Sequence, residues 1–238
     1  MEVSLSFDGE THPSRFFHKN PKMKRFKSWD PSTPFAPYFD IPIFLDTCGS
    51  TITSDLNDFI HGMELGDYES SNGWTTYNIF DSDDLIVKVL CDKIYQVYEE
   101  YVTELEDEVI PKDKLWIRGW AVRLEEGQQI KHHSHAFHEN TFISGNISLS
   151  DLDTTTDYYF PYLGWYFGYY KIQNTPGKMV MFPSWLEHKV DPNTTGQVRF
   201  SLAFDMFTEH TINYIGENRN ENEEFTKVIL LSKRMDEI

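Results

Sequence analysis

Apolar side chains recur at helical spacing along one stretch of the chain. The positions that share this spacing are Ile86, Leu90, Ile94, Val97, Tyr101 and Leu105. Intervals of three and four residues bring side chains to one face of an α-helix. Residues 82–84 offer capping groups before the pattern, and Pro111 follows its end. The pattern predicts one long helix whose apolar face packs on the outside of a sheet.

Beyond Pro111 the apolar spacing changes from helical to alternating. The clearest alternation covers residues 198–207, where Val198 and Phe200 begin a series of apolar side chains at every second position. The positions between them are occupied by Arg199, Ser201, Ala203 and Asp205. A period of two puts the two sets on opposite faces of a strand. We expect the apolar face to pack and the polar face to form the wall of a pocket.

Further extended segments precede this strand. They cover residues 116–124, 143–149, 158–160, 165–172 and 178–182. Several short strands joined by turns are typical of an antiparallel jelly roll or barrel. The sequence therefore predicts a mainly β fold of the α+β type, with helices flanking the barrel.

The chain divides into a central domain and two polar ends. Residues 1–36 form a polar, proline-rich arm, residues 37–207 the β domain with its helical support, and residues 208–238 a polar tail. Within the tail, the apolar residues 228–231 predict a short helix. The arm carries basic residues between Arg15 and Lys27, which could dock on the acidic body, a second subunit or an anionic partner, or stay solvated. We expect a homodimer to be possible through such surfaces.

Charge and cysteine content exclude several classes of partner. The chain has 21 Lys and Arg against 38 Asp and Glu, a formal net charge of -17. This excess of negative charge disfavours a phosphate backbone, so no nucleic-acid partner is expected. Cys48 and Cys91 are too few for a disulfide framework, which favours a reducing, cytoplasmic compartment. Because neither a signal-peptide pattern nor a long apolar run occurs, we expect no membrane association.

Two histidine clusters predict a metal site built across strands. His133 and His135 are one residue apart, so on an extended strand they point to the same face. His188 can close the site from another strand. With Glu139 available as a carboxylate and no cysteine nearby, the ligands favour a first-row divalent ion, and iron(II) suits an open site that activates oxygen. We expect the flanking His132 to point away or to lie in a turn.

Arg199 follows His188 by eleven residues and alternates into the polar face of the last strand. Its planar guanidinium matches a carboxylate with two hydrogen bonds, and Ser201 on the same face can add a hydroxyl donor. These two residues predict a clamp for a carboxylate of an acidic co-substrate. The structural alternative is an ion pair between Arg199 and Asp205 or a loop carboxylate.

A set of short motifs carries a family resemblance. They are Ser71-Asn-Gly-Trp74, the glycine and spaced histidines from Gly127 to His135, Ile143-Ser-Gly145, Pro176-Gly177, Phe182-Pro-Ser-Trp-Leu-Glu-His188 and Arg199-Phe-Ser201. In these motifs the chain resembles the iron(II)- and 2-oxoglutarate-dependent oxygenases common in marine bacteria and their phages. The histidine spacing also resembles the general cupin motif. Both resemblances imply a double-stranded β-helix, and the first implies a bacterial or phage-infected host cell.

The chain departs from the oxygenase pattern at one ligand. Such enzymes usually carry a histidine, one spacer and a carboxylate, whereas the residue two positions after His133 is His135. The ligand set is therefore either His133, His135 and His188, or a set in which Glu139 is a fourth or substitute ligand.

The resemblance implies an iron(II)- and 2-oxoglutarate-dependent dioxygenase that uses O2, with hydroxylation as the expected reaction. Its substrate is an unidentified small molecule or peptidyl side chain. The alternative is a metal-binding cupin, either a structural or binding module or an enzyme that needs no 2-oxoglutarate. Replacement of Arg199 discriminates between them, because only the oxygenase requires this residue for co-substrate binding.

Overall fold

The computed structural model describes residues 22–28, 32–35, 38–63, 73–75, 77–105, 114–135, 142–160, 168–217 and 228–231. The strands are β1 (Met23–Lys27), β2 (Asp40–Thr47), β3 (Gly73–Trp74), β4 (Trp116–Leu124), β5 (Ile130–His133), β6 (Ile143–Ser148), β7 (Thr155–Tyr159), β8 (Tyr169–Gln173), β9 (Lys178–Pro183), β10 (Glu187–Val190), β11 (Arg199–Phe207) and β12 (Ile229–Leu230). The helices are α1 (Ser50–His61), the 3-10 turn η1 (Ile79–Asp81), α2 (Leu85–Leu105) and α3 (Glu209–Glu217).

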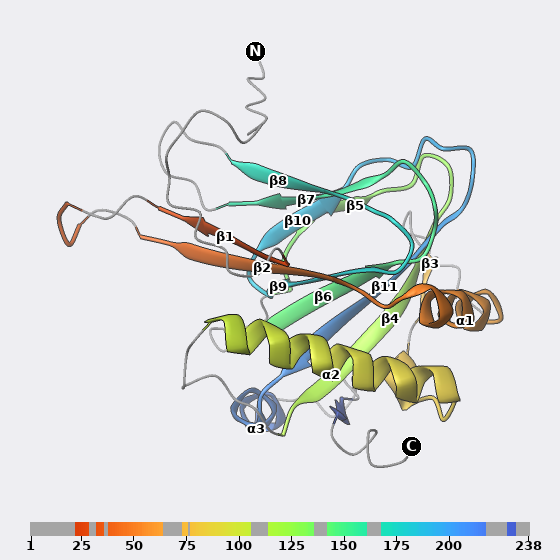
Figure 1. Ribbon diagram of the computed structural model, residues 1–238, viewed down its shortest axis with the longest axis horizontal. Coiled ribbons are helices and arrows are strands. Elements are labelled where there is room, and N and C mark those ends of the chain that lie inside the picture. The colour runs from red at the N-terminus through yellow and green to blue at the C-terminus, as the bar shows by residue number, and fades with distance from the viewer. Residues whose placement is uncertain are drawn as a thin grey trace.

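Two antiparallel sheets face each other across the barrel interior (Figure 1). The larger sheet has the order β1-β2-β9-β6-β11-β4-β12, with β3 also beside β4, and the smaller has the order β5-β10-β7-β8. This arrangement confirms the predicted mainly β fold and its double-stranded β-helix architecture. Strands β5 and β10, which carry His133 and His188, are neighbours in the smaller sheet.

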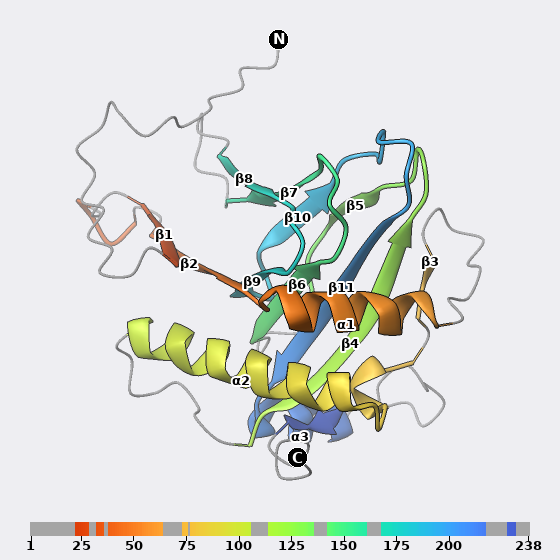
Figure 2. The same ribbon diagram turned by 45° about the vertical axis from the view of Figure 1, so that its right-hand side comes forward.

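Helices α1 and α2 cover the outer face of the larger sheet, away from the smaller sheet (Figure 2). The side chains predicted to share one helical face, from Leu90 to Tyr101, are buried in α2. They join the outward-facing residues Leu202, Phe204 and Met206 of β11 in one apolar cluster. Burial of this continuous apolar surface is the main stabilising contribution to the layer between helices and sheet.

Strand β11 alternates as its sequence predicts. Leu202 and Phe204 face the helices, while Arg199, Ser201 and Asp205 are buried on the opposite, inward face. Gly145 lies opposite Phe204 in the neighbouring strand β6, and a Cβ at position 145 would collide with the Phe204 ring. A glycine is therefore needed at position 145, where the Phe204 ring crosses β6. The polar side chains of β11 line the opposite, interior face.

The two ends of the chain add strands to the larger sheet. Residues 228–231 were expected to be helical, but Ile229 and Leu230 form β12, which pairs with Ile117 and Trp116 at the edge of β4. That prediction is wrong at these positions because the edge of β4 offers unpaired backbone groups that a short apolar segment satisfies. The helix of the tail is α3 instead.

Part of the predicted N-terminal arm also joins the sheet. Met23–Lys27 form β1, which pairs along β2, and residues 1–21 lie outside the described part of the chain. The basic side chains of β1 and of Lys22 contact acids of the body: Arg25 and Lys27 bind Asp40, and Lys22 binds Glu100 at 2.7 Å. Of the partners considered for the basic run, the acidic body is the one these residues contact. Among the described helices none combines the length and apolar character needed to cross a membrane.

Candidate metal centre

Three histidines converge between the two sheets. His133 ends β5 and lies directly opposite His188 of β10 in the strand register. His135 follows two residues later, and its backbone N–H donates to the Ser184 carbonyl at 2.8 Å. This hydrogen bond holds His135 beside the connection between β9 and β10. The ring centroids are 4.3 Å apart for His133 and His188, and 5.1 Å for each pair that includes His135. One ring nitrogen from each lies within 4.8 Å of the other two.

Each of the three rings is held by a hydrogen bond at Nδ1. His133 donates to the Lys131 carbonyl at 2.7 Å and His188 to the Leu186 carbonyl at 3.1 Å. His135 Nδ1 lies 2.6 Å from Oδ1 of Asp205. Because carbonyl and carboxylate oxygens only accept, Nδ1 carries the proton in each ring and Nε2 presents a lone pair. All three histidines that the sequence predicts as ligands therefore adopt the same tautomer, with the proton on Nδ1 and the lone pair on Nε2.

The three Nε2 atoms fit a divalent metal ion. Nε2 of His133 lies 3.2 Å from Nε2 of His135. Two imidazole lone pairs at this separation repel each other unless a proton or a cation lies between them. Three neutral imidazoles are also the donor set of several first-row metal sites. The residues present therefore fit the ion that the sequence predicts.

Burial favours the neutral form of His133 and of His188. The pKa of His188 is lowered well below its ordinary value of 6.5, first by burial and then by His135 and His133. The pKa of His133 is lowered by burial and by His135. A metal ligand must be deprotonated to bind, so both shifts favour metal binding at neutral pH.

Asp205 is a buried carboxylate beside the histidines. Its Oδ1 accepts from Ser144 Oγ at 2.6 Å as well as from His135, and its Oδ2 accepts from Arg118 Nη2 at 2.9 Å. Burial alone would raise the pKa of Asp205, but His135, Arg118 and Ser144 hold it below its ordinary value. The carboxylate is therefore ionised and bound on both oxygens.

Arg199 lies in the same interior and is only 4% exposed. Its Nη1 atom is buried and has no hydrogen-bond partner among the described residues. Burial lowers the pKa of Arg199 to about 10, and the nearby Tyr158 opposes this shift. The Asp205 carboxylate is bound by Arg118 instead, so the alternative in which Arg199 pairs with Asp205 is not observed. A buried guanidinium nitrogen without an acceptor marks a place where an anion would bind favourably.

Tyr158 connects the two ends of this interior and was missed by the sequence analysis. Its ring stacks on His188 with centroids 5.7 Å apart, and its hydroxyl accepts from Asn146 Nδ2 at 2.6 Å. It is fully buried, and burial raises its pKa. The segment around it is rich in aromatic residues, so the sequence does not distinguish this ring from those that only pack. Its place beside His188 on β10 follows from the strand register alone.

The remaining candidates are placed as follows. Ser201 is buried on the same face of β11 as Arg199. His132 points to the outer side of the smaller sheet, where Nε2 lies 3.2 Å from Glu187, so the expectation that it points away is confirmed. Glu139 lies outside the described residues.

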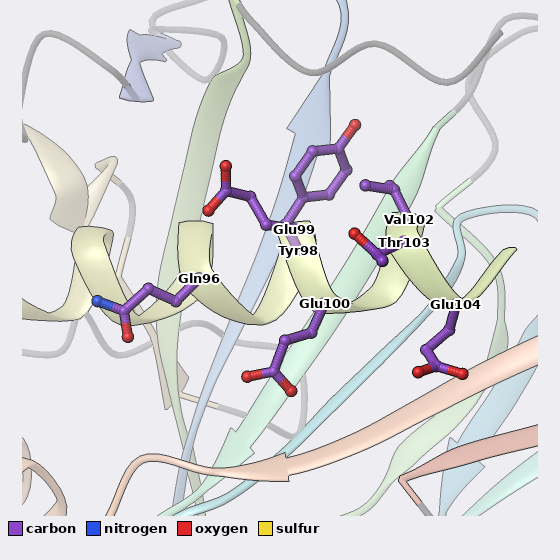
Figure 3. A pocket seen from close by; sticks show the side chains of 7 residues that line it. All are labelled: Gln96, Tyr98, Glu99, Glu100, Val102, Thr103 and Glu104. Carbon is purple, nitrogen blue, oxygen red and sulfur yellow. The ribbon is translucent and has the colours of Figure 1, made fainter. Parts of the chain in front are cut away.

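A surface hollow lies on the opposite side of the larger sheet. It runs along α2 and is lined by Gln96, Tyr98, Glu99, Glu100, Val102, Thr103 and Glu104 (Figure 3). These side chains come from one helix and include no histidine or cysteine. This hollow therefore offers no imidazole or thiol ligand for a metal ion.

Comparison with known proteins agrees with the geometry. Residues 164–205, which include His188, Arg199 and Ser201, match the family model described as "Putative 2OG-Fe(II) oxygenase". No curated protein matches by sequence. Among solved structures, a Pseudomonas putida prolyl-4-hydroxylase has a TM-score of 0.55 at 14% identity, with 70% of this chain and 92% of that chain covered.

Two further structures share the fold. HygX from Streptomyces hygroscopicus, solved with nickel and 2-oxoglutarate bound, has a TM-score of 0.53 at 12% identity, with 70% of this chain and 83% of that one covered. The alpha-ketoglutarate-dependent epimerase SnoN of nogalamycin biosynthesis has a TM-score of 0.54 at 10% identity, with coverage of 70% and 78%. The resemblance to iron(II)- and 2-oxoglutarate-dependent oxygenases is confirmed by the matched segment and by this fold, whereas the marine bacterial or phage origin stays a prediction.

Proposed function

We propose that this chain, whose residues 164–205 carry the signature of the 2OG-Fe(II) oxygenases and whose fold is theirs, is an iron(II)- and 2-oxoglutarate-dependent dioxygenase that hydroxylates its substrate. One observation carries the proposal. The same barrel interior holds three converging imidazole nitrogens and a buried arginine nitrogen without an acceptor. A 2-oxo diacid is the kind of molecule that could satisfy both.

The three histidines would hold the metal. His133, His135 and His188 each present Nε2, and their Nδ1 hydrogen bonds prevent the rings from rotating away. Iron(II) in a site of this type supplies oxygen activation, with 2-oxoglutarate as the co-substrate. Three protein ligands leave coordination positions open for small molecules. The protein contributes fixed ligand geometry and a shielded interior.

Arg199 would bind the distal carboxylate of 2-oxoglutarate. Its guanidinium is fixed at the start of β11, and Ser201 lies two residues further along the same inward face. The Tyr158 hydroxyl already accepts from Asn146, so its own proton is available to a carboxylate. A charge-assisted pair in a water-poor interior is stronger than the same pair in solvent.

Hydroxylation is the reaction we assign within this class. Structures with this fold include both a prolyl-4-hydroxylase and an epimerase, so the fold alone permits either outcome. Hydroxylation would need the metal, the oxo acid, O2 and a substrate C–H bond held near the open positions. Among the described residues, the titratable side chains beside the histidines are Asp205 and Tyr158, and both are already hydrogen-bonded, Asp205 to His135 and Arg118 and Tyr158 to Asn146.

The test is an anaerobic titration of metal-free protein with iron(II) and then 2-oxoglutarate, followed by visible absorption. We expect the weak charge-transfer band of a metal-chelated oxo acid in the wild type and its loss in Arg199→Ala. Arg123→Ala is the matched control, because Arg123 lies on β4 and binds only the exposed Glu125. If iron binds and no band forms in the wild type, the oxygenase proposal is wrong and a metal-binding cupin is favoured.

Substrate conversion is tested separately. With iron(II), 2-oxoglutarate and O2 supplied, succinate release should depend on His188 and Arg199 and should increase when a hydroxylatable substrate is present. A product that has gained one oxygen atom supports hydroxylation. A product of unchanged mass with inverted configuration would instead identify an epimerase.

A further inference from the structure

Asp205 is a buried acid for which the proposed chemistry assigns no direct contact with metal or co-substrate. Its side chain faces the barrel interior from β11 and the residue is 1% exposed. Two donors bind each oxygen: His135 and Ser144 at Oδ1, and the Nη2 and Nε atoms of Arg118 at Oδ2, the last at 3.1 Å. Four hydrogen bonds from three side chains hold this carboxylate in one orientation.

His135 differs from the other two histidines in the acceptor at Nδ1. His133 and His188 donate to backbone carbonyls two residues away in the chain, so their tautomers are fixed by local strand geometry. His135 donates to a side chain seventy positions further along the sequence. A carboxylate is also a stronger acceptor than a carbonyl, and it makes the opposite ring nitrogen a better metal donor.

Arg118 approaches Asp205 from a fixed direction. Its guanidinium carbon lies 5.7 Å from the centroid of Trp120 and 5.4 Å from that of Phe207. The Trp120 ring in turn packs against His135, with centroids 5.5 Å apart. Arg118 lies directly opposite Asp205 in the paired strands β4 and β11, which also carry Trp120 and Phe207. The support for His135 is thus built into the larger sheet.

We propose that Asp205 is a positioning residue that holds His135 in the Nδ1–H tautomer, so that Nε2 remains a metal ligand, and that Arg118 fixes the orientation of Asp205. This inference rests on the proposed function in one respect, namely that His135 binds the metal. It concerns the protein's own hydrogen bonds and is measurable before any metal is added.

The substitution Asp205→Asn exposes the role because an amide has one oxygen and one NH2 group. The two N–H donors of Arg118 require the oxygen, which turns the NH2 group toward His135 and Ser144. An NH2 group donates, so it favours a lone pair on Nδ1 of His135 and a proton on Nε2. A ring protonated at Nε2 cannot bind the metal there. The variant keeps the shape of the site while reversing the direction of the hydrogen bond between residue 205 and Nδ1 of His135.

Asp157→Asn is the matched control. Asp157 is 2% exposed, pairs with Lys171 at 2.9 Å and lies on β7 next to Tyr158. Because neighbouring residues of a strand point to opposite faces, Asp157 faces away from the histidines. This substitution removes a buried carboxylate of the same barrel without touching His135.

The first measurement is the tautomer of His135 in metal-free protein, read from imidazole nitrogen chemical shifts by nuclear magnetic resonance at mildly alkaline pH. We expect the Nδ1–H form in the wild type and in Asp157→Asn, and the Nε2–H form in Asp205→Asn. An Nε2–H ring in the wild type, or an unchanged tautomer in Asp205→Asn, overturns the inference. The wild-type result decides the matter even if the variant does not fold.

The second measurement is titration with cobalt(II), which resists oxidation and reports its ligands by visible absorption. Loss of an outer partner of a metal-bound histidine weakens metal binding by about 10-fold to 100-fold. We expect this loss in Asp205→Asn and not in Asp157→Asn. Equal affinities in both variants contradict the role of Asp205. Failure of the wild type to bind cobalt(II) is a different result, which contradicts the metal site itself.

Discussion

The barrel interior buries a negative charge at one end, where Asp205 lies beside the histidines (the metal end), and a positive charge at the other, at Arg199 (the arginine end). The two charges differ in their hydrogen-bond partners. Asp205 and Arg199 lie on the same inward face of β11, six residues apart, and both are almost inaccessible to solvent. The carboxylate of Asp205 is bound by three protein side chains, whereas Nη1 of Arg199 has no partner. The described residues satisfy both oxygens of Asp205. They leave Nη1 of Arg199 without an acceptor, which the carboxylate of the proposed co-substrate would supply.

The largest effect should follow from removing a metal ligand. His188→Ala deletes the most deeply buried of the three imidazoles, and two remaining nitrogens bind a divalent ion too weakly to retain it. We expect no saturable cobalt(II) binding and no succinate release. His132→Ala, on the outer side of the same sheet, should bind as the wild type does. Retained affinity in His188→Ala would show that the metal lies elsewhere.

The metal end should also be the more costly to disrupt in the metal-free protein. Asp205→Ala leaves Arg118 beside an empty space and removes the acceptor of His135. Removing one partner of a buried pair costs about 3 kcal/mol of the free energy of unfolding. Urea denaturation in the presence of a chelator measures this loss. A cost as small as that of a surface substitution would mean that Asp205 is not a structural anchor of the interior.

The arginine end should behave in the opposite way. Arg199→Met removes a buried charge without a partner, so the free energy of unfolding of the metal-free protein should stay the same or rise. In metal-loaded wild type, 2-oxoglutarate at 100 times its dissociation constant should add about 2.7 kcal/mol. The variant should gain none of this. A marked loss of stability in metal-free Arg199→Met would indicate that Arg199 is a structural residue.

Acidification should produce a smaller, graded effect that originates at the metal end. In the folded protein the pKa values of His133 and His188 lie below the ordinary 6.5. The unfolded chain therefore binds protons first as the pH falls below about 6.5, and stability declines from there toward the folded pKa values. We expect denaturation at pH 7 and at pH 5.5 to show this decline in the wild type and less of it in His188→Ala. An equal decline of the free energy of unfolding between pH 7 and pH 5.5 in the wild type and in His188→Ala would contradict the assignment of this effect to His188 and His133.

The sequence predicts the strands of the site well because alternation and histidine spacing are local signals. The inward face of β11 follows directly from a period of two, whereas His135 lies two residues beyond the end of β5 and is held in the site by its backbone hydrogen bond to Ser184. Asp205 and Tyr158 could be located but not assigned, because their roles depend on which strands pair. The contact between His135 and Asp205 spans both sheets. Likewise, β12 forms because the edge of β4 has backbone groups available for pairing, and the sequence of residues 228–231 carries no information about that edge.

The central claim is that one molecule with an oxo acid at one end and a carboxylate at the other bridges the metal and Arg199. Calorimetric titration of cobalt(II)-loaded protein with 2-oxoglutarate and with 2-oxobutyrate, which lacks the distal carboxylate, tests it most directly. We predict that 2-oxoglutarate binds much more tightly than 2-oxobutyrate, and that Arg199→Met abolishes the difference. Equal binding of the two acids to the wild type would contradict the claim.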